Sequence, residues 1–310
     1  MANWTIQCAE RYLAIMYDYL HSKLYTFSVL QADETTVFVN KDGRPAGSKS
    51  YMWLYRTVES VQKEQILLYE YQKTRNSNHP RTFLKSFHGI CITDGYQVYH
   101  TLEQEREDLQ IAGCWAHVRR RYDEALKALP KEKRNQSTAH RGLVMIQAIY
   151  RNEKPLKELS AEERRERRQL SVKPLVEAYF TWVHATIGQV MPKSKLWEGL
   201  NYSINQERYL KVFLENGNVP IDNNASERSI RSFCIGRKNF VMIDTLHGAA
   251  ASAIIYSIAE TAKANGLKPY EYFELLLTEI PKHLDDDDLN FCEKLLPWSK
   301  DLPEKCRKKQ

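Results

Sequence analysis

The pattern of apolar and polar residues divides the N-terminal third of the chain into one helix and three strands. Residues 2–24 carry apolar side chains at a helical spacing, which predicts a helix at the start of the chain. Runs rich in Val, Phe, Thr and aromatic residues follow, and a Lys-Asp-Gly-Arg-Pro turn cluster separates the first two. This pattern predicts a three-stranded antiparallel meander. The three runs are 27–40, 51–58 and 65–71.

Shorter apolar runs then alternate with helical stretches. A short helix at 80–87 is expected before a buried strand at 89–96, and a second strand at 109–115 before a basic helix. A meander followed by alternating helices and strands predicts an α/β fold, of the α+β kind, with a mixed sheet and helices on its faces.

The β character disappears between residues 130 and 215, which we interpret as a helical insertion. The pattern at Ser160–Glu163 is typical of a capping box at the start of a helix. From His117 to Lys173 basic residues outnumber acidic ones two to one, which fits either a solvated helix surface or a surface that faces a polyanion. The predicted parts are a helix at 1–24, a core at 25–129 and 216–281, the insertion at 130–215 and a tail at 282–310.

Composition narrows the class of protein. The 310 residues carry a formal net charge of +6, a modest lean toward polyanionic partners. Six cysteines without a C-x-x-C pair indicate reduced thiols rather than a disulfide framework. No apolar run approaches the roughly 18–20 residues of a membrane span, and no secretion signal opens the chain. We therefore expect a cytoplasmic protein with no membrane contact.

Residues 219–231 carry the first candidate for chemistry. Asp222, Asn223 and Asn224 are residue types that cap helices. Asn224 and Glu227 have the spacing of a capping box, in which Glu227 turns back on its own helix. The alternative is that Glu227 projects from the first helical turn toward a metal ion.

Two acids in strands are the second candidate. Asp33 lies within the first predicted strand and Asp94 at the end of a buried one, and acids are disfavoured in both places. A divalent cation would explain them, but so would an edge strand and a turn. Cys114 and His117 are too few for a zinc site, and a core thiol with a nearby histidine is the simpler interpretation.

Several motifs, in order along nearly the whole chain, carry a resemblance to a known family. The chain resembles transposases of the insertion sequence 66 family, whose catalytic domain is similar to ribonuclease H. The motifs are Ala-Asp-Glu-Thr-Thr at 32–36, Thr-Asp-Gly-Tyr at 93–96, Gly-Cys-Trp-Ala-His-Val-Arg-Arg at 113–120, Asp-Asn-Asn-Ala-Ser-Glu-Arg-Ser-Ile-Arg at 222–231, Gly-Arg-Lys-Asn-Phe at 236–240 and Leu-Leu-Pro-Trp at 295–298.

The resemblance implies a DDE triad at Asp33, Asp94 and Glu227 that holds two Mg²⁺ or Mn²⁺ ions. It also implies a ribonuclease H-like core with the helical insertion between the second Asp and the Glu. DNA, both transposon ends and target, is the implied partner, and Glu34 and His117 are residues expected near the site. The expected DNA contacts are His117, Arg119, Arg120, Arg228, Arg231, Arg237 and Lys238.

The activity implied by the resemblance is metal-dependent DNA strand cleavage and strand transfer, in a bacterial protein associated with the nucleoid. Homodimers and accessory proteins of the same element are further implied partners. Family members carry N-terminal DNA-recognition elements that this sequence does not match, so we expect a chain that lacks them. The alternatives are a truncated remnant that binds DNA or a full-length transposase without cleaving, and a nuclease or resolvase without strand transfer.

Overall fold

The computed structural model describes residues 2–45, 47–59, 61 and 63–308, and it divides the chain into two compact units. The first unit takes in the chain up to Gly89 and again from Ala225, and the second runs from Ile90 to Asn224. The second unit is thus an insertion into the first along the sequence.

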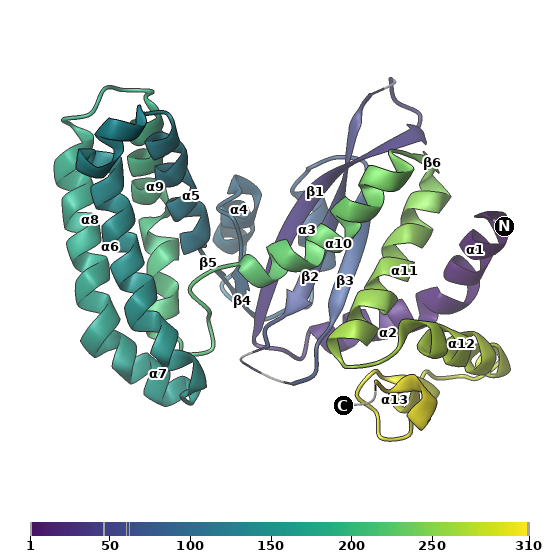
Figure 1. Cartoon of the computed structure of the whole chain (residues 1–310). Coiled ribbons are helices and arrows are strands. Elements are labelled where there is room, and N and C mark those ends of the chain that lie inside the picture. The colour runs from purple at the N-terminus through teal and green to yellow at the C-terminus, as the bar shows by residue number, and fades with distance from the viewer. Residues whose placement is uncertain (1, 46, 60, 62, 309–310) are drawn as a thin grey trace. The chain divides into compact units, whose positions relative to one another are not determined.

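The first unit is built on a mixed sheet. Strands β1 (Val29–Lys41), β2 (Lys49–Thr57) and β3 (Leu67–Gln72) pair antiparallel in chain order, which confirms the predicted meander (Figure 1). A short strand, β6 (Ile243–Thr245), adds to the other end of β1 in parallel. The sequence did not predict β6. The mixed sheet and the helices around it confirm the α/β class.

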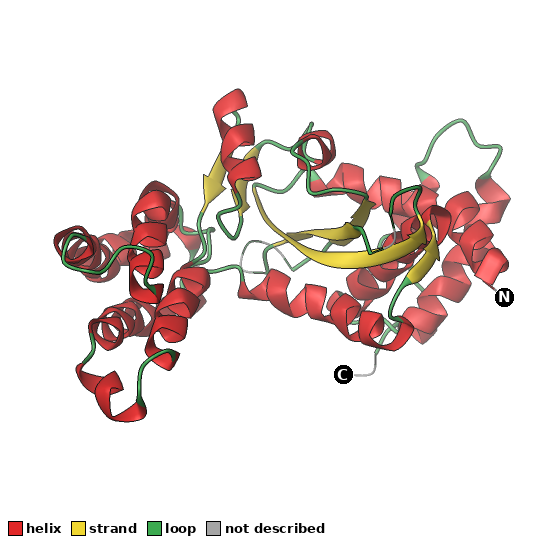
Figure 2. Cartoon of the chain, turned by 90° about the horizontal axis from the view of Figure 1, so that it is seen from above, coloured by secondary structure: helices red, strands yellow, loops and turns green. Residues whose placement is uncertain are grey.

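One face of this sheet is covered by α10 (Asn224–Phe240) and α11 (Leu246–Ala264), as Figure 2 shows from above. Val37 and Leu54 of the sheet pack in one buried cluster with Ile230 and Phe233 of α10. The hydroxyls of α11 also complete the edge of β3. Ser257 Oγ accepts the Tyr69 N–H at 2.7 Å, so a backbone donor that an edge strand leaves unpaired is satisfied.

Helix α3 contacts the opposite face, and the N-terminal helix packs on α3 through His21, whose ring stacks on Phe83. The predicted first helix is confirmed as α1 (Ala2–Cys8) and α2 (Ala14–Leu24), joined by a π-helical turn, η1 (Ala9–Leu13). Helix α3 (Asn78–Phe83) begins earlier than expected. Phe83 stacks on Tyr55 of β2 with ring centroids 3.8 Å apart. The remaining elements of this unit are α12 (Pro269–Glu279), η5 (Ile280–His283), α13 (Phe291–Leu295) and η6 (Glu304–Cys306).

The second unit joins a short strand pair to a set of helices. Strands β4 (Gly89–Ile92) and β5 (Leu109–Ala112) are neighbours, connected by α4 (Gln97–Glu105). Trp115, Tyr122 and Tyr179 are fully buried between the helices. The helices are α5 (Trp115–Lys127), η2 (Lys131–Gln136), α6 (Thr138–Glu153), η3 (Lys154–Glu158), α7 (Ala161–Arg167), the π-helical η4 (Arg168–Val172), α8 (Lys173–Ile187) and α9 (Lys195–Glu215).

Short local motifs mark the ends of two helices. Ser160 and Glu163 form a complete capping box at the start of α7. Gly266 follows α11 with a φ of +73°, the left-handed conformation that ends many helices. Helix caps can therefore be predicted from neighbouring residues where no other polar group competes for them.

Candidate active site

Asp33 lies in the middle of β1, on the face that α10 covers. Side chains alternate between the two faces of a strand, so Asp33 shares a face with Thr35 and Val37. Val37 packs against α10, and Thr35 Oγ1 accepts a hydrogen bond of 3.1 Å from Arg237 of that helix. The Asp33 carboxylate is half-buried, and its Oδ1 accepts the Glu34 N–H at 2.9 Å.

Glu227 lies in the first turn of α10, on the stripe of the helix that faces the sheet. Ile230 and Cys234 follow it at three and seven residues, which places the three on one side of a helix. Ile230 belongs to the buried cluster, and Cys234 Sγ donates to Thr35 Oγ1 at 3.5 Å. The half-buried Glu227 therefore belongs to the side of α10 that packs on β1 and β2.

Arg56 of β2 fixes the position of the first turns of α10 along the strands of the sheet. Its Nη1 donates to Ala225 O at 3.1 Å and to Ser229 Oγ at 2.9 Å, on either side of Glu227 in the sequence. Arg56 is paired in register with Gln31, two residues before Asp33. The first turn of α10 therefore lies over the part of the sheet that carries Asp33. An arginine within an aromatic strand was the available signal for this residue, which the sequence patterns above did not single out.

The predicted capping box at Asn224 is wrong. Asn224 is already inside the helix, and its backbone N–H donates to Asp222 Oδ1 at 3.1 Å. Its side-chain Nδ2 donates to Asp222 Oδ2 at 2.7 Å. Because Asp222 supplies the capping acceptor, Glu227 is not needed for that role.

Asp94 follows β4 in the second unit, in a turn rather than at the end of the strand. Its Oδ1 accepts the Tyr96 N–H at 2.9 Å, just before α4 begins. Its backbone oxygen accepts a hydrogen bond of 2.6 Å from the Tyr202 hydroxyl of α9. Gly95 has a φ of +89°, a conformation that other residues adopt only with strain.

Asp33 and Glu227 are thus on one face of one unit, and Asp94 is in the other unit. Among the residues that the structure describes, no three His, Cys, Asp or Glu side chains cluster as ligands for a metal ion. All three acids offer carboxylate oxygens, the hard donors that Mg²⁺ and Mn²⁺ prefer. The donor chemistry of these residues therefore fits the implied cofactor.

Glu34 belongs to a different environment from Asp33, which corrects the expectation that it lies near the site. It faces the opposite side of the sheet, where its nearly buried carboxylate accepts a hydrogen bond of 2.7 Å from Arg75 Nε. Trp53 is its register partner and also pairs with Glu70 of β3. Burial raises the pKa of Glu70 to about 7.

Cys114 is a core thiol, as the sequence indicated. It is fully buried, and burial raises its pKa to about 12, so the thiol is neutral at ordinary pH. Its sulfur accepts the Asn223 N–H at 3.1 Å. His117 lies in the first turn of α5, half-buried, with its Nε2 3.2 Å from Nη1 of the exposed Arg120.

The basic residues of α10 divide into two kinds. Arg228, Arg231 and Lys238 are exposed. Arg237 is half-buried and donates to Thr35 Oγ1 and to Thr36 Oγ1, at 3.1 and 3.2 Å, and to the Thr36 backbone oxygen. Arg237 therefore anchors the end of α10 on β1, and its expected contact with DNA stays a prediction.

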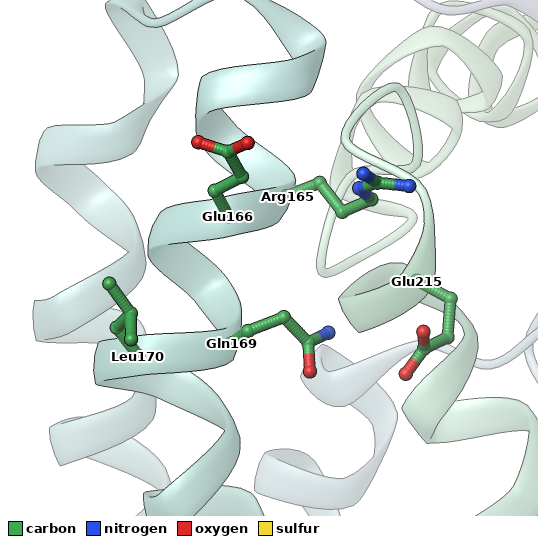
Figure 3. Close-up of a pocket in the computed structure, with 5 residues that line it drawn as sticks. All are labelled: Arg165, Glu166, Gln169, Leu170 and Glu215. Carbon is green, nitrogen blue, oxygen red and sulfur yellow. The ribbon is translucent and has the colours of Figure 1, made fainter.

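A separate surface pocket of about 410 Å³ lies in the second unit, between α7, η4 and the end of α9 (Figure 3). The Gln169 side chain extends toward the end of α9, where its Nε2 donates to Leu214 O at 2.9 Å. None of the predicted site residues lines this pocket, and Leu170 on its edge is 74% exposed. Its lining residues are Arg165, Glu166, Gln169, Leu170 and Glu215.

Comparison with known families accounts for nearly all of the chain. Residues 1–251 match the model described as Transposase IS66 family, and residues 257–298 match the IS66 C-terminal element. The chain therefore belongs to the IS66 family of transposases. No described helix is both long and apolar enough to span a membrane.

Three similar proteins come from Sinorhizobium fredii (strain NBRC 101917 / NGR234), each described as an uncharacterized protein. The protein y4qI is 28% identical over 309 residues, which cover 96% of this chain and 56% of y4qI. The protein y4jD is 27% identical over 74% of this chain and 45% of its own length. The protein y4hP is 24% identical over 91% of this chain and 52% of its own length. The chain thus spans about half the length of these relatives.

Proposed function

We propose that this chain carries the catalytic part of a DNA transposase of the DDE type with a ribonuclease H-like core. In this proposal Asp33, Asp94 and Glu227 act together in divalent-metal-dependent cleavage and transfer of DNA strands. One observation carries it: Asp33 on β1 and Glu227 on α10 share one face of the sheet, at the level where Arg56 holds the helix. Membership of the IS66 family supports the same function.

The three acids would hold two Mg²⁺ or Mn²⁺ ions through carboxylate oxygens. When bound, such ions supply the activation of an attacking oxygen and the stabilisation of a leaving one in phosphodiester chemistry. The role of the protein is to hold each carboxylate in a fixed position. Asp33 lies within a paired strand, Glu227 in an anchored helical turn, and Asp94 in a turn whose backbone oxygen is hydrogen-bonded to Tyr202.

Exposed basic residues would hold the DNA. Arg228, Arg231 and Lys238 lie on the same helix as Glu227, so they would contact phosphates next to the reacting bond. Arg119 and Arg120 are exposed on α5, beside His117. These contacts are independent of base sequence. We further propose that the whole transposase recognises the transposon ends. It would do so as a homodimer and with accessory proteins of the same element.

The test is DNA cleavage and joining by the purified chain, with duplexes that carry the ends of its mobile element and a supercoiled target plasmid. We expect nicked and joined products with Mg²⁺ or Mn²⁺ and none with excess chelator. Asp33→Asn, Asp94→Asn and Glu227→Gln should each lower the rate by at least about 10³-fold, because each removes a charged ligand of the ions. Glu34→Gln is the matched control, since this neighbouring acid faces the other side of the sheet.

Three results would overturn the proposal. Cleavage that persists in Asp94→Asn would exclude the proposed triad. Salt-sensitive DNA binding by the wild-type chain with no product under any metal condition would favour a DNA-binding remnant instead. Cleaved but never joined products would indicate a nuclease of the same fold.

A further inference from the structure

We propose that the helical region of the second unit positions the catalytic carboxylates, with Tyr202 and Tyr150 as the residues that transmit this support. The inference rests on the proposed function, since it gives a role to residues 130–215 in presenting Asp94 and Glu227. It follows from two sets of contacts inside the second unit. Both involve helix α9 or the segment that leaves it.

The first set holds the turn that carries Asp94. The Tyr202 hydroxyl of α9 donates to Asp94 O at 2.6 Å. A Cβ on Gly95 would lie 2.9 Å from Gln206 Oε1 and 3.0 Å from the Tyr202 hydroxyl, so α9 packs directly on this turn. His100 of α4 stacks on Tyr209 with ring centroids 3.8 Å apart. The turn and the helix after it are therefore both supported by one face of α9.

The second set holds the end of α9 and the turn that follows it. Arg168 is buried against Glu153, and its Nη1 donates to the carbonyl oxygens of Phe213 and Asn216 at 2.5 and 3.0 Å. Arg164 Nη1 donates to Gly217 O at 2.8 Å. Buried guanidinium groups with backbone acceptors make strong, directional hydrogen bonds. The chain therefore leaves α9 along a fixed path.

The same path continues to the first residue of α10. The Trp115 N–H donates to Ile221 O at 3.2 Å, and the Asn223 N–H donates to Cys114 Sγ. The Tyr150 hydroxyl of α6 donates to Asp222 Oδ2 at 3.0 Å, and Asp222 Oδ1 accepts the N–H of Asn224. Asn224 begins α10, three residues before Glu227.

Both tyrosines are suited to a lasting structural role. Burial raises the pKa of Tyr150 and of Tyr202 well above the ordinary value of tyrosine, so each phenol stays protonated and donates its hydrogen bond at any ordinary pH. Neither residue is a catalytic group in this proposal. Their effect is on the positions of a turn and a helix start, and small displacements of reacting groups, on the order of 1 Å, can lower a rate by about 10²-fold.

The experiment compares three tyrosine-to-phenylalanine variants of the full chain. Tyr202→Phe removes the hydrogen bond to Asp94, and Tyr150→Phe the one to Asp222. Tyr179→Phe is the matched control, because its buried hydroxyl bonds Tyr122 and Ser203 within the helices and contacts neither segment. The measurements are kcat and KM for DNA, and hydrogen exchange of the amides at 94–99 and 222–228.

We expect Tyr202→Phe to speed exchange at 94–99 and Tyr150→Phe at 222–228, each with a fall in kcat of about tenfold to 10²-fold and little change in KM. Tyr179→Phe should lower the melting temperature without either effect. Unchanged exchange at both segments would overturn the inference, as would an equal loss of kcat in the control or exchange changes that leave kcat intact.

The two proposals fail in different ways. A wild-type chain that does not cleave DNA under any metal condition counts against the proposed function, and hydrogen exchange then still decides whether the tyrosines position the two segments. A cleaving wild type with fully active phenylalanine variants leaves the proposed function in place and overturns the positioning role.

Discussion

The guanidinium of Arg56 donates a hydrogen bond of 2.9 Å to the hydroxyl of Ser229, and this contact ties the first turns of α10 to the middle strand of the meander. Arg56 is only 4% exposed; its Nη2 donates to Gln65 Oε1 and Glu59 Oε1, and its Nε donates to Thr57 O. A buried guanidinium whose Nη1 donates to the start of a helix has a structural role. Here that role is the placement of the helix that carries Glu227.

We predict that Arg56→Met lowers the free energy of unfolding by about 3 kcal/mol, because several buried acceptors lose their donor. Ser229→Ala should cost about 1 kcal/mol, since it removes one of these bonds. Lys282→Met, which breaks an exposed pair with Glu279, should cost about 0.5 kcal/mol or less. Urea unfolding of the three variants measures these differences. Equal values for Arg56→Met and Lys282→Met would show that Arg56 does not anchor α10.

Residue patterns along the chain were sufficient to predict the meander and most helices. Runs of β-branched and aromatic residues and a turn cluster are local signals, and they predict the antiparallel pairing of β1 with β2. Strand β6 was missed because Ile243–Thr245 is three residues long and pairs with β1 from far along the chain. The false capping box at Asn224 has a similar origin, since Asp222 competes for the same backbone donors.

The residue types of the candidate site could be predicted from the sequence, but the face of the strand or helix on which each side chain lies could not. Asp33 and Glu34 are adjacent acids, and they point to opposite faces of the strand. Which of them points toward α10 is known only from the structure, in which Val37, on the same face as Asp33, packs against that helix. Arg237 and Lys238 are likewise adjacent, yet Arg237 bonds β1 while Lys238 is exposed. A linear sequence does not say which side of a helix meets a distant strand.

Glu70 gives a prediction about pH. Burial raises its pKa from 4.5 to about 7, so the folded protein binds a proton that the unfolded chain releases between these values. Stability from this group is therefore full below about pH 4.5 and is lost as the pH rises toward 7. Glu70→Gln should remove this loss and raise the free energy of unfolding at pH 8, by on the order of 1–3 kcal/mol.

Urea unfolding at pH 5, 6, 7 and 8 measures the effect, with Glu64→Gln as the control for the loss of another glutamate of the same unit. A wild type and a Glu70→Gln variant whose stabilities stay parallel over this range would contradict the prediction. Because Glu70 faces the same side of the sheet as Glu34, DNA cleavage by the variant should be unchanged.

The proposed metal ligands predict a stability effect that does not depend on catalysis. A ligand that binds the folded chain alone stabilises it by about 2.7 kcal/mol at 100 times its Kd. We expect Mn²⁺ or Mg²⁺ to raise the melting temperature of the wild type and excess chelator to reverse the rise. The rise should be much smaller in Glu227→Gln and unchanged in Glu34→Gln. The same rise in all three proteins would mean that the ions bind elsewhere.

The basic residues of α10 predict a division between DNA affinity and stability. Lys238 is exposed, so Lys238→Ala should lower the slope of log K against log salt concentration by about 1, with folding unchanged. The Arg237 guanidinium donates hydrogen bonds to Thr35 and Thr36, so Arg237→Ala should instead lower the free energy of unfolding by about 1–2 kcal/mol. Fluorescence anisotropy with a labelled duplex at several salt concentrations gives the first quantity, and urea unfolding the second. A lower salt slope in Arg237→Ala at full stability would show that Arg237 contacts DNA phosphates and is not needed to hold α10 on β1.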